Sequence, residues 1–103
     1  MPKYRVEITK VAEKDILEIY QYIYRDSPMS AKKWAEEIER QINSLESFPK
    51  RCPVISETEE IGREYRHLIY GNYRTVFRIQ SSKVIIMRVI NSARLFDLHI
   101  FEE

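Results

Sequence analysis

The feature that most constrains the fold is a two-residue turn, Gly71-Asn72, between two β-favouring runs. Residues 65–70 and 73–79 are both rich in aromatic and β-branched side chains. Glycine at the first turn position favours a type II′ hairpin, whose twist matches that of the flanking strands. A third run of this kind, 83–90, follows a weaker turn signal at Ser81-Ser82. Three consecutive antiparallel strands are therefore predicted.

The N-terminal half combines one strand with two helices. Residues 3–8 alternate between polar and apolar side chains, which is typical of a half-buried strand. Apolar residues then recur at helical spacing over 10–25, with Thr9 placed to cap the first turn. Ser27-Pro28 is a second helix start, and Pro49 is expected to stop that helix. The apolar stripe of the second helix comprises Ala31, Trp34, Ala35, Ile38, Ile42 and Leu45.

The order β-α-α-β-β-β, without repeats, predicts a single domain over residues 1–103. Two helices joined by a short link form a hairpin, and both must bury their stripes on the same sheet face. The predicted class is α+β: two layers, with the N-terminal helical hairpin packed on one face of a mainly antiparallel sheet. Residues 49–62, with two prolines and a glycine, are a predicted loop that has room for a short helical turn.

Two-residue loops also fix the strand register, because side chains alternate between faces. Tyr70 then opposes Tyr73, and Gln80 opposes Lys83. The face predicted to meet the helices carries Leu68, Tyr70, Tyr73, Thr75, Phe77, Ile79, Val84, Ile86 and Ile90. The face turned away from the helices, here called the outer face, is predicted to carry Tyr65, His67, Ile69, Arg74, Val76, Arg78, Ile85, Met87, Val89 and Asn91.

Two arginines, Arg66 and Arg88, fall on the helix side in this register. Either they pair at the sheet margin with helix carboxylates such as Asp15 or Glu18, or a β-bulge shifts the register. The sequence leaves both possibilities open.

The outer face is predicted to combine Arg74 and Arg78 with an apolar patch. That patch would comprise Ile69, Val76, Ile85, Met87 and Val89. A solvated face on which arginine stems cover apolar atoms is the simpler alternative. Because an exposed patch of this kind usually marks an interaction site, we predict a binding surface.

Charge is distributed unevenly along the chain, although the net charge is only +1. Residues 62–94 hold seven basic residues and one acid, a net +6, whereas the remainder holds 10 basic and 15 acidic residues, a net −5. This asymmetry favours an anionic partner. Alternatively, the basic segment neutralises the acidic helices within one fold.

Composition argues against several protein classes. No apolar run approaches the ~20 residues of a membrane span, and no secretory leader is visible, so no membrane association is expected. The single Cys52 has no disulfide partner within the chain, which fits a reducing, cytoplasmic setting. The sequence has no phosphate-binding glycine loop and no Cys/His spacing suited to zinc, so neither cofactor nor metal is expected.

The two histidines, His67 and His99, are the candidates for proton transfer. Arginines on the outer face would stabilise a phosphorane-like transition state, with His67 carrying the proton. A plain surface role for His67 is the simpler interpretation.

Five segments, followed by Arg94, carry a family resemblance. They are YRVEI (4–8), AEKDILEIYQYI (12–23), LESFP (45–49), YRTVFRI (73–79) and VIIMRVIN (84–91). In this order and spacing they resemble the RelE/ParE superfamily of toxins from type II toxin–antitoxin modules, over nearly the whole chain.

The resemblance implies a protein that inhibits growth unless a cognate antitoxin wraps it. In the RelE-like branch the activity is ribosome-dependent cleavage of mRNA, and Arg74 and Arg94 match arginines of that branch. In the ParE-like branch the target is DNA gyrase, and RNase residues are lacking. Candidate catalytic residues are His67, Arg74 and Arg94. Candidate residues for binding the target or antitoxin are Arg74, Arg78, Met87, Val89, Asn91 and Arg94.

This chain departs from the RNase pattern at several positions. Arg66 and His67 stand where RNase members often have lysines, Asn91 replaces a common histidine, and 98–101 lacks the usual tyrosine. These departures and the long helix pair favour the ParE-like, plasmid-stabilisation type, with gyrase as target. An mRNA endoribonuclease is the alternative, and a non-toxic interaction module of the same fold is a third possibility.

A small acidic antitoxin is the expected partner. Its amphipathic tail would cover Arg74, Arg78 and the apolar patch. The sequence leaves both a homodimer and a toxin–antitoxin heterotetramer open.

Overall fold

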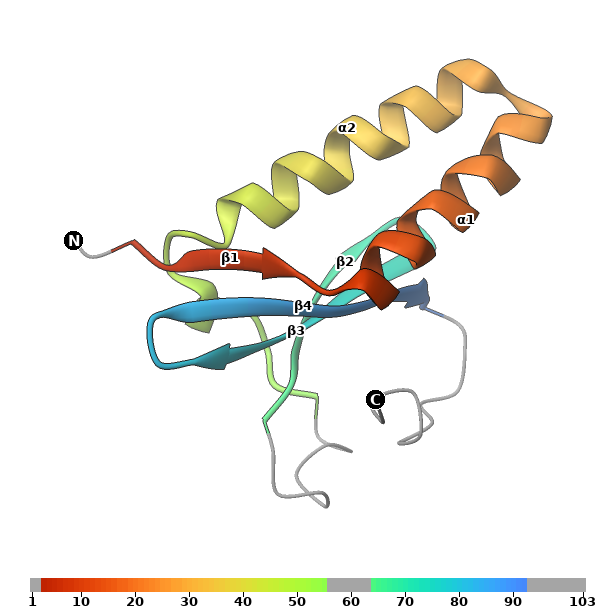
Figure 1. Ribbon diagram of the computed structural model, residues 1–103. Coiled ribbons are helices and arrows are strands. Elements are labelled where there is room, and N and C mark those ends of the chain that lie inside the picture. Colours follow the sequence, from red (N-terminus) through yellow and green to blue (C-terminus); the bar gives the residue numbers. More distant parts are fainter. Residues whose placement is uncertain (1–2, 56–63, 93–103) are drawn as a thin grey trace.

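A helical hairpin covers one face of a four-stranded sheet (Figure 1). The computed structural model describes residues 3–55 and 64–92. In chain order the elements are β1 (Arg5–Ile8), α1 (Lys10–Asp26), α2 (Pro28–Ser44), the 3₁₀ helix η1 (Pro49–Arg51), β2 (Arg66–Tyr70), β3 (Tyr73–Gln80) and β4 (Lys83–Asn91). The sheet order is β1-β4-β3-β2, with β1 parallel to β4 and the other pairs antiparallel. The predicted α+β class and mainly antiparallel sheet are therefore confirmed.

Side-chain caps set the start of both helices, as predicted. Thr9 Oγ1 accepts a hydrogen bond from the Ala12 amide at 3.1 Å, and Ser27 Oγ accepts one from the Ser30 amide at 3.1 Å. The Ser27 amide also donates to the Ile23 carbonyl, so one residue ends α1 and begins α2.

The second helix ends at Ser44, earlier than the predicted stop at Pro49. The Leu45 and Glu46 amides each donate to a carbonyl three residues back, which tightens the chain into 3₁₀ geometry. Phe48 then adopts a left-handed φ of 51° and redirects the backbone. The 3₁₀ turn at Leu45 and Glu46 therefore ends the helix before the chain reaches Pro49.

The core between helices and sheet contains the apolar stripes of both helices. Its buried members are Ala12, Trp34, Ile38, Ile42, Leu45, Cys52, Phe77, Val84, Ile86 and Val89. Burial of these apolar side chains is the main contribution that holds the two layers together.

The two hairpin turns both contain a residue with positive φ. Gly71 has a φ of 57°, as the predicted turn requires, whereas Ser81 adopts a φ of 54° at the second turn, where there is no glycine.

A β-bulge between β3 and β4 alters the predicted register. Val76 pairs with Arg88, but the next residue, Phe77, pairs with Ile86, so Met87 is the extra residue in β4. Past a bulge, every side chain of the strand projects to the opposite face from the one that strict alternation gives.

Four predicted positions are therefore wrong. Arg88 was expected on the helix side, but it pairs with Val76 of the outer face. Val89 and Asn91 were expected on the outer face, but they pair with Thr75 and Tyr73 and share the helix side with them. Val89 is part of the core beneath the helices. Ile90, expected under the helices, belongs to a cluster on the outer face.

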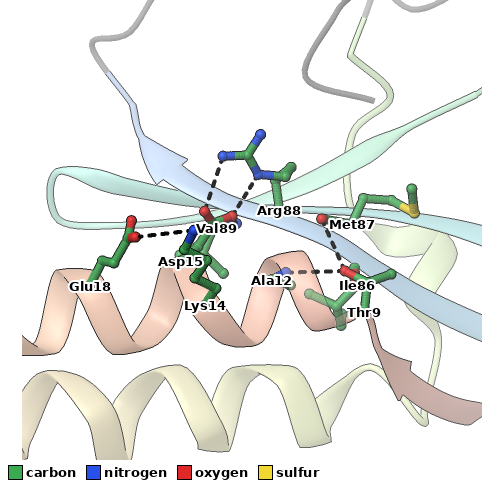
Figure 2. Close-up of polar contacts among 9 residues, drawn as sticks. All are labelled: Thr9, Ala12, Lys14, Asp15, Glu18, Ile86, Met87, Arg88 and Val89. Carbon is green, nitrogen blue, oxygen red and sulfur yellow. Dashed lines mark hydrogen bonds and ion pairs between the residues drawn. The ribbon is translucent and has the colours of Figure 1, made fainter. Parts of the chain in front are cut away.

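The first two turns of α1 close the edge of β4 where β1 stops (Figure 2). Pairing between β1 and β4 ends at Ile8 opposite Ile86. The Thr9 amide donates to the Ile86 carbonyl at 3.1 Å. The Thr9 hydroxyl lies 2.9 Å from the same carbonyl and 3.2 Å from that of Met87. Polar groups at the helix start thus replace a strand partner.

One turn later, Asp15 makes three hydrogen bonds to β4, here called the Asp15 latch. Its carboxylate accepts from Arg88 Nε at 2.6 Å, from Arg88 Nη2 at 3.0 Å and from the Val89 amide at 3.0 Å. The Asp15 and Arg88 side chains are only 10% and 18% exposed. Hydrogen bonding to Asp15 raises the pKa of the Arg88 guanidinium against the opposing effect of burial. The expected pairing of Arg88 with Asp15 is confirmed.

Replacing Asp15 with alanine is expected to destabilise the fold by about 3 kcal/mol, because it leaves a largely buried guanidinium and a strand-edge amide without their acceptor. Asp15→Asn keeps an oxygen for the Val89 amide and should lose less. Urea unfolding measures both. Lys3→Ala removes an exposed ion pair to Glu46 and serves as the control, with a loss below about 1 kcal/mol. An equal loss in Asp15→Ala and Lys3→Ala would contradict the assigned role of the latch.

Candidate functional site

The outer face brings one histidine and two arginines together, here called the cationic site: His67, Arg74 and Arg78. His67 on β2 pairs directly with Val76 on β3. Arg74 and Arg78 flank Val76 two positions away on either side, so they are the diagonal neighbours of His67, at roughly 7–8 Å between backbones. Predicted positions for all three residues on this face are confirmed.

Both arginines are half-buried and anchored to the sheet. Arg74 Nη2 donates to the Ser92 carbonyl at 3.1 Å, which ties β3 to the end of β4. Arg78 Nη2 donates to Gln80 Oε1 at 3.3 Å along its own strand. Held guanidinium groups lose less freedom on binding than mobile ones, so the site suits carboxylates or phosphates.

Much of the predicted apolar patch is a second core. Val76 is fully buried, Met87 is 9% exposed and Ile90 is 4% exposed, in a cluster completed by Ile55 and Tyr65. The prediction that Val76 and Met87 are exposed is therefore wrong. Ile69, at 57% exposed, is the apolar side chain of the patch that does face solvent.

The segment just after η1 explains this burial. The Ile55 amide donates to the Tyr65 carbonyl at 2.7 Å, and the His67 amide donates to the Pro53 carbonyl at 3.3 Å. Val54 forms an isolated antiparallel bridge with Arg66. Residues 53–55 therefore pair along the outer edge of β2 and bring Ile55 over the outer face. A β-branched pair directly after proline, within a region interpreted as loop, was the signal for this contact.

Arg66, the other arginine predicted on the helix side, has a structural role there. It pairs with Phe77 across the sheet, and its Nη1 donates to the carbonyls of Lys50 and Cys52 at 3.2 and 2.6 Å. It thus fastens η1 to β2 and does not reach the helix carboxylates that the sequence suggested.

The predicted site residues are therefore only partly brought together. His67, Arg74 and Arg78 share the outer face, Met87 is buried beneath it, and Val89 and Asn91 face the helices. Arg94 and His99 lie outside the described residues.

Other reactive groups in the described part of the chain offer little chemistry. Burial raises the pKa of the Cys52 thiol, although Arg51 and Arg66 oppose the shift, so Cys52 is a poor nucleophile. Within residues 3–55 and 64–92, no three His, Cys, Asp or Glu side chains gather to hold a metal ion. The same residues contain no helix that is long and apolar enough to cross a bilayer.

Known proteins offer three points of comparison. A family model described as the ParE toxin of the type II toxin–antitoxin system, parDE, matches residues 6–96. A structure from the chromosomal ParDE system of P. aeruginosa is 20% identical, covers 88% of this chain and 98% of its own, and superposes with a TM-score of 0.69. A structure from the RelBE2 toxin–antitoxin complex of Mycobacterium tuberculosis is 25% identical, covers 91% and 97%, and has a TM-score of 0.60. No curated protein matches the sequence.

The second core makes a direct prediction about stability. Met87→Ala should cost about 2–5 kcal/mol, because it removes a buried side chain at the bulge and leaves a cavity. Ile69→Ala on the same face should change stability by no more than about 0.5 kcal/mol, since that side chain is mostly solvated. Thermal or urea unfolding distinguishes the two. Similar small losses would mean that the outer face is an open surface at both positions.

Proposed function

Because this chain belongs to the ParE toxin family of type II toxin–antitoxin systems, we propose that it arrests growth by binding DNA gyrase and that a cognate antitoxin neutralises it. The family match supports a toxin, and the structural neighbours come from toxin–antitoxin systems. We choose gyrase over mRNA as the target because the burial and composition of the cationic site suit the binding of a protein.

The observation that favours docking over catalysis is that few side chains of the outer face are both exposed and able to transfer a proton. Val76, directly opposite His67, is fully buried in the second core. His67 is the one histidine in the described part of the chain. Arg74, with exposed Ile69 directly opposite it on β2, resembles the mixture of arginine and apolar side chains typical of protein-binding hot spots. An acidic antitoxin segment would cover the same arginines and so exclude the target.

A second candidate function, ribosome-dependent cleavage of mRNA, is favoured by one feature. His67 lies between two arginines on a single face. A histidine can transfer the proton while guanidinium groups stabilise negative charge on the phosphorus oxygens. If this is the activity, His67→Gln should slow mRNA cleavage by about 10²–10⁴-fold. A rate that does not change would remove His67 from that mechanism.

Induced expression, with and without the adjoining reading frame, tests the proposed function. Growth arrest with accumulating DNA breaks and intact mRNA is expected, together with rescue by a small acidic neighbour. Arrest with mRNA cut at codon positions would instead establish the nuclease. Unaffected growth would overturn both toxin proposals and favour a non-toxic interaction module.

Arg74→Ala should weaken toxicity while the fold is retained. Loss of a charged contact at an interface costs about 2–5 kcal/mol, so affinity for the target should fall by about 30-fold or more. Growth arrest at matched expression and pull-down of gyrase measure the effect. Arg40→Ala, an exposed α2 arginine that pairs with Glu37, is the matched control and should remain fully toxic. An Arg74→Ala protein that unfolds would show that its bond to Ser92 is structural.

A further inference from the structure

A cleft lies between α1 and the C-terminal end of β4, on the opposite side of the sheet from the cationic site. Its volume is about 230 Å³. It is lined by Asp15, Glu18, Ile19, Tyr73, Arg88, Val89, Ile90 and Asn91. It lies beyond the point where β1 stops pairing with β4 at Ile86. The family match and the cationic site leave this cleft without an assigned role.

A stripe of α1 contributes Asp15 and Glu18 to the cleft and carries an exposed side chain at each end, outside the lining. Val11, Asp15, Glu18 and Tyr22 follow one another at spacings of four, three and four residues, so they lie on one stripe of the helix. Asp15 is turned towards β4, whereas Val11 is 52% and Tyr22 is 65% exposed. Large apolar side chains at both ends of one stripe form a surface that a partner can cover.

Negative charge lies between these two apolar ends. Asp15 is fully used by the latch, whereas Glu18 has a 3.9 Å contact with Lys14, shown in Figure 2, and adds through its charge to the raised pKa of Arg88. The Glu18 and Lys14 side chains are 62% and 76% exposed, so this ion pair contributes little. Because Arg88 offsets the charge of Asp15, the exposed Glu18 carboxylate is the group of the cleft that attracts a basic side chain.

Tyr73 is the tyrosine that lines the cleft. Burial raises the pKa of the Tyr73 hydroxyl, and the nearby Tyr22 adds to the shift. Tyr73 is also held edge-on against Trp34, with ring centroids 5.5 Å apart. A fixed aromatic ring and the Glu18 carboxylate in the same lining suit the stem and the charged head of arginine or lysine.

We propose that this cleft is a docking site for an extended segment of the antitoxin that carries one basic residue between two apolar residues. The proposal rests on the proposed function for the existence of that partner. The distance from Val11 to Tyr22 along the helix is about 16 Å. At about 3.3 Å per residue, five or six extended residues cover it, with the basic side chain opposite Glu18.

This assignment implies a partner with two kinds of charge. The arginines of the outer face attract an acidic stretch, and the cleft on the helix side attracts a basic residue. An antitoxin that contacts both sides of the sheet therefore needs both, in separate parts of its sequence.

Charge reversal at Glu18 tests the cleft. The full-length chain is mixed with the antitoxin encoded by the adjoining reading frame, and the dissociation constant is measured at several salt concentrations. Glu18→Lys should weaken binding by about tenfold or more and lower its salt dependence. Glu13→Lys makes the same charge change on an exposed α1 position outside the cleft and should leave affinity within about twofold.

Two further binding measurements test the cleft independently of the charge at Glu18 alone. Tyr22→Ala should also weaken antitoxin binding, whereas Tyr24→Ala, which removes a tyrosine of similar exposure from another stripe, should not. Changing the basic residue of the antitoxin to glutamate should restore binding to Glu18→Lys. Thermal unfolding of each variant confirms that the fold is intact.

Equal affinities for Glu18→Lys and Glu13→Lys, with a complex still formed, would overturn the cleft assignment and leave the proposed function standing. If Glu18→Lys reduced growth arrest but not antitoxin binding, the cleft would serve the toxin's target and the proposal would be wrong. Absence of any complex with the adjoining product would overturn the proposed function itself.

Discussion

The hydrogen bonds of Asp15 to β4 are the constraint on which the rest of the arrangement depends. Strand β1 is only four residues long, so the second half of β4 has β3 on one side and no strand partner on the β1 side. Thr9 and Asp15 bond that edge from α1 and thereby fix the helix over the sheet. Because an unpaired strand edge is open to pairing with other chains, the same contacts protect the fold from unwanted association.

Because of the bulge at Met87, strand β4 contributes side chains to both cores. Residues before it place Val84 and Ile86 under the helices, and residues after it place Val89 there while Ile90 faces outward. Together with Ile55 and Tyr65, this gives the small domain apolar packing on both sides of its sheet. The surface left for binding is consequently narrow: half-buried arginines, one histidine and an exposed isoleucine.

The two faces of the sheet differ in charge as well as in packing. The outer face presents the guanidinium groups of Arg74 and Arg78, and the cleft on the helix side presents the carboxylate of Glu18. Such a division fits the two binding surfaces that we propose. It also explains why a net charge of +1 says little about what either face binds.

The sequence alone determined the elements and their caps. Helical periodicity, Thr9, Ser27 and the Gly71-Asn72 turn are local signals, and the fold class and the shared face of His67, Arg74 and Arg78 followed from them. The register beyond Met87 and the cover supplied by Ile55 did not, since both depend on contacts between residues far apart in the chain. For Arg88 the sequence offered a bond to Asp15 or a shifted register as alternatives, and only the tertiary structure showed that both are present. The physical reason is that the bond joins Arg88 to a carboxylate 73 residues earlier in the chain, which local sequence patterns do not place.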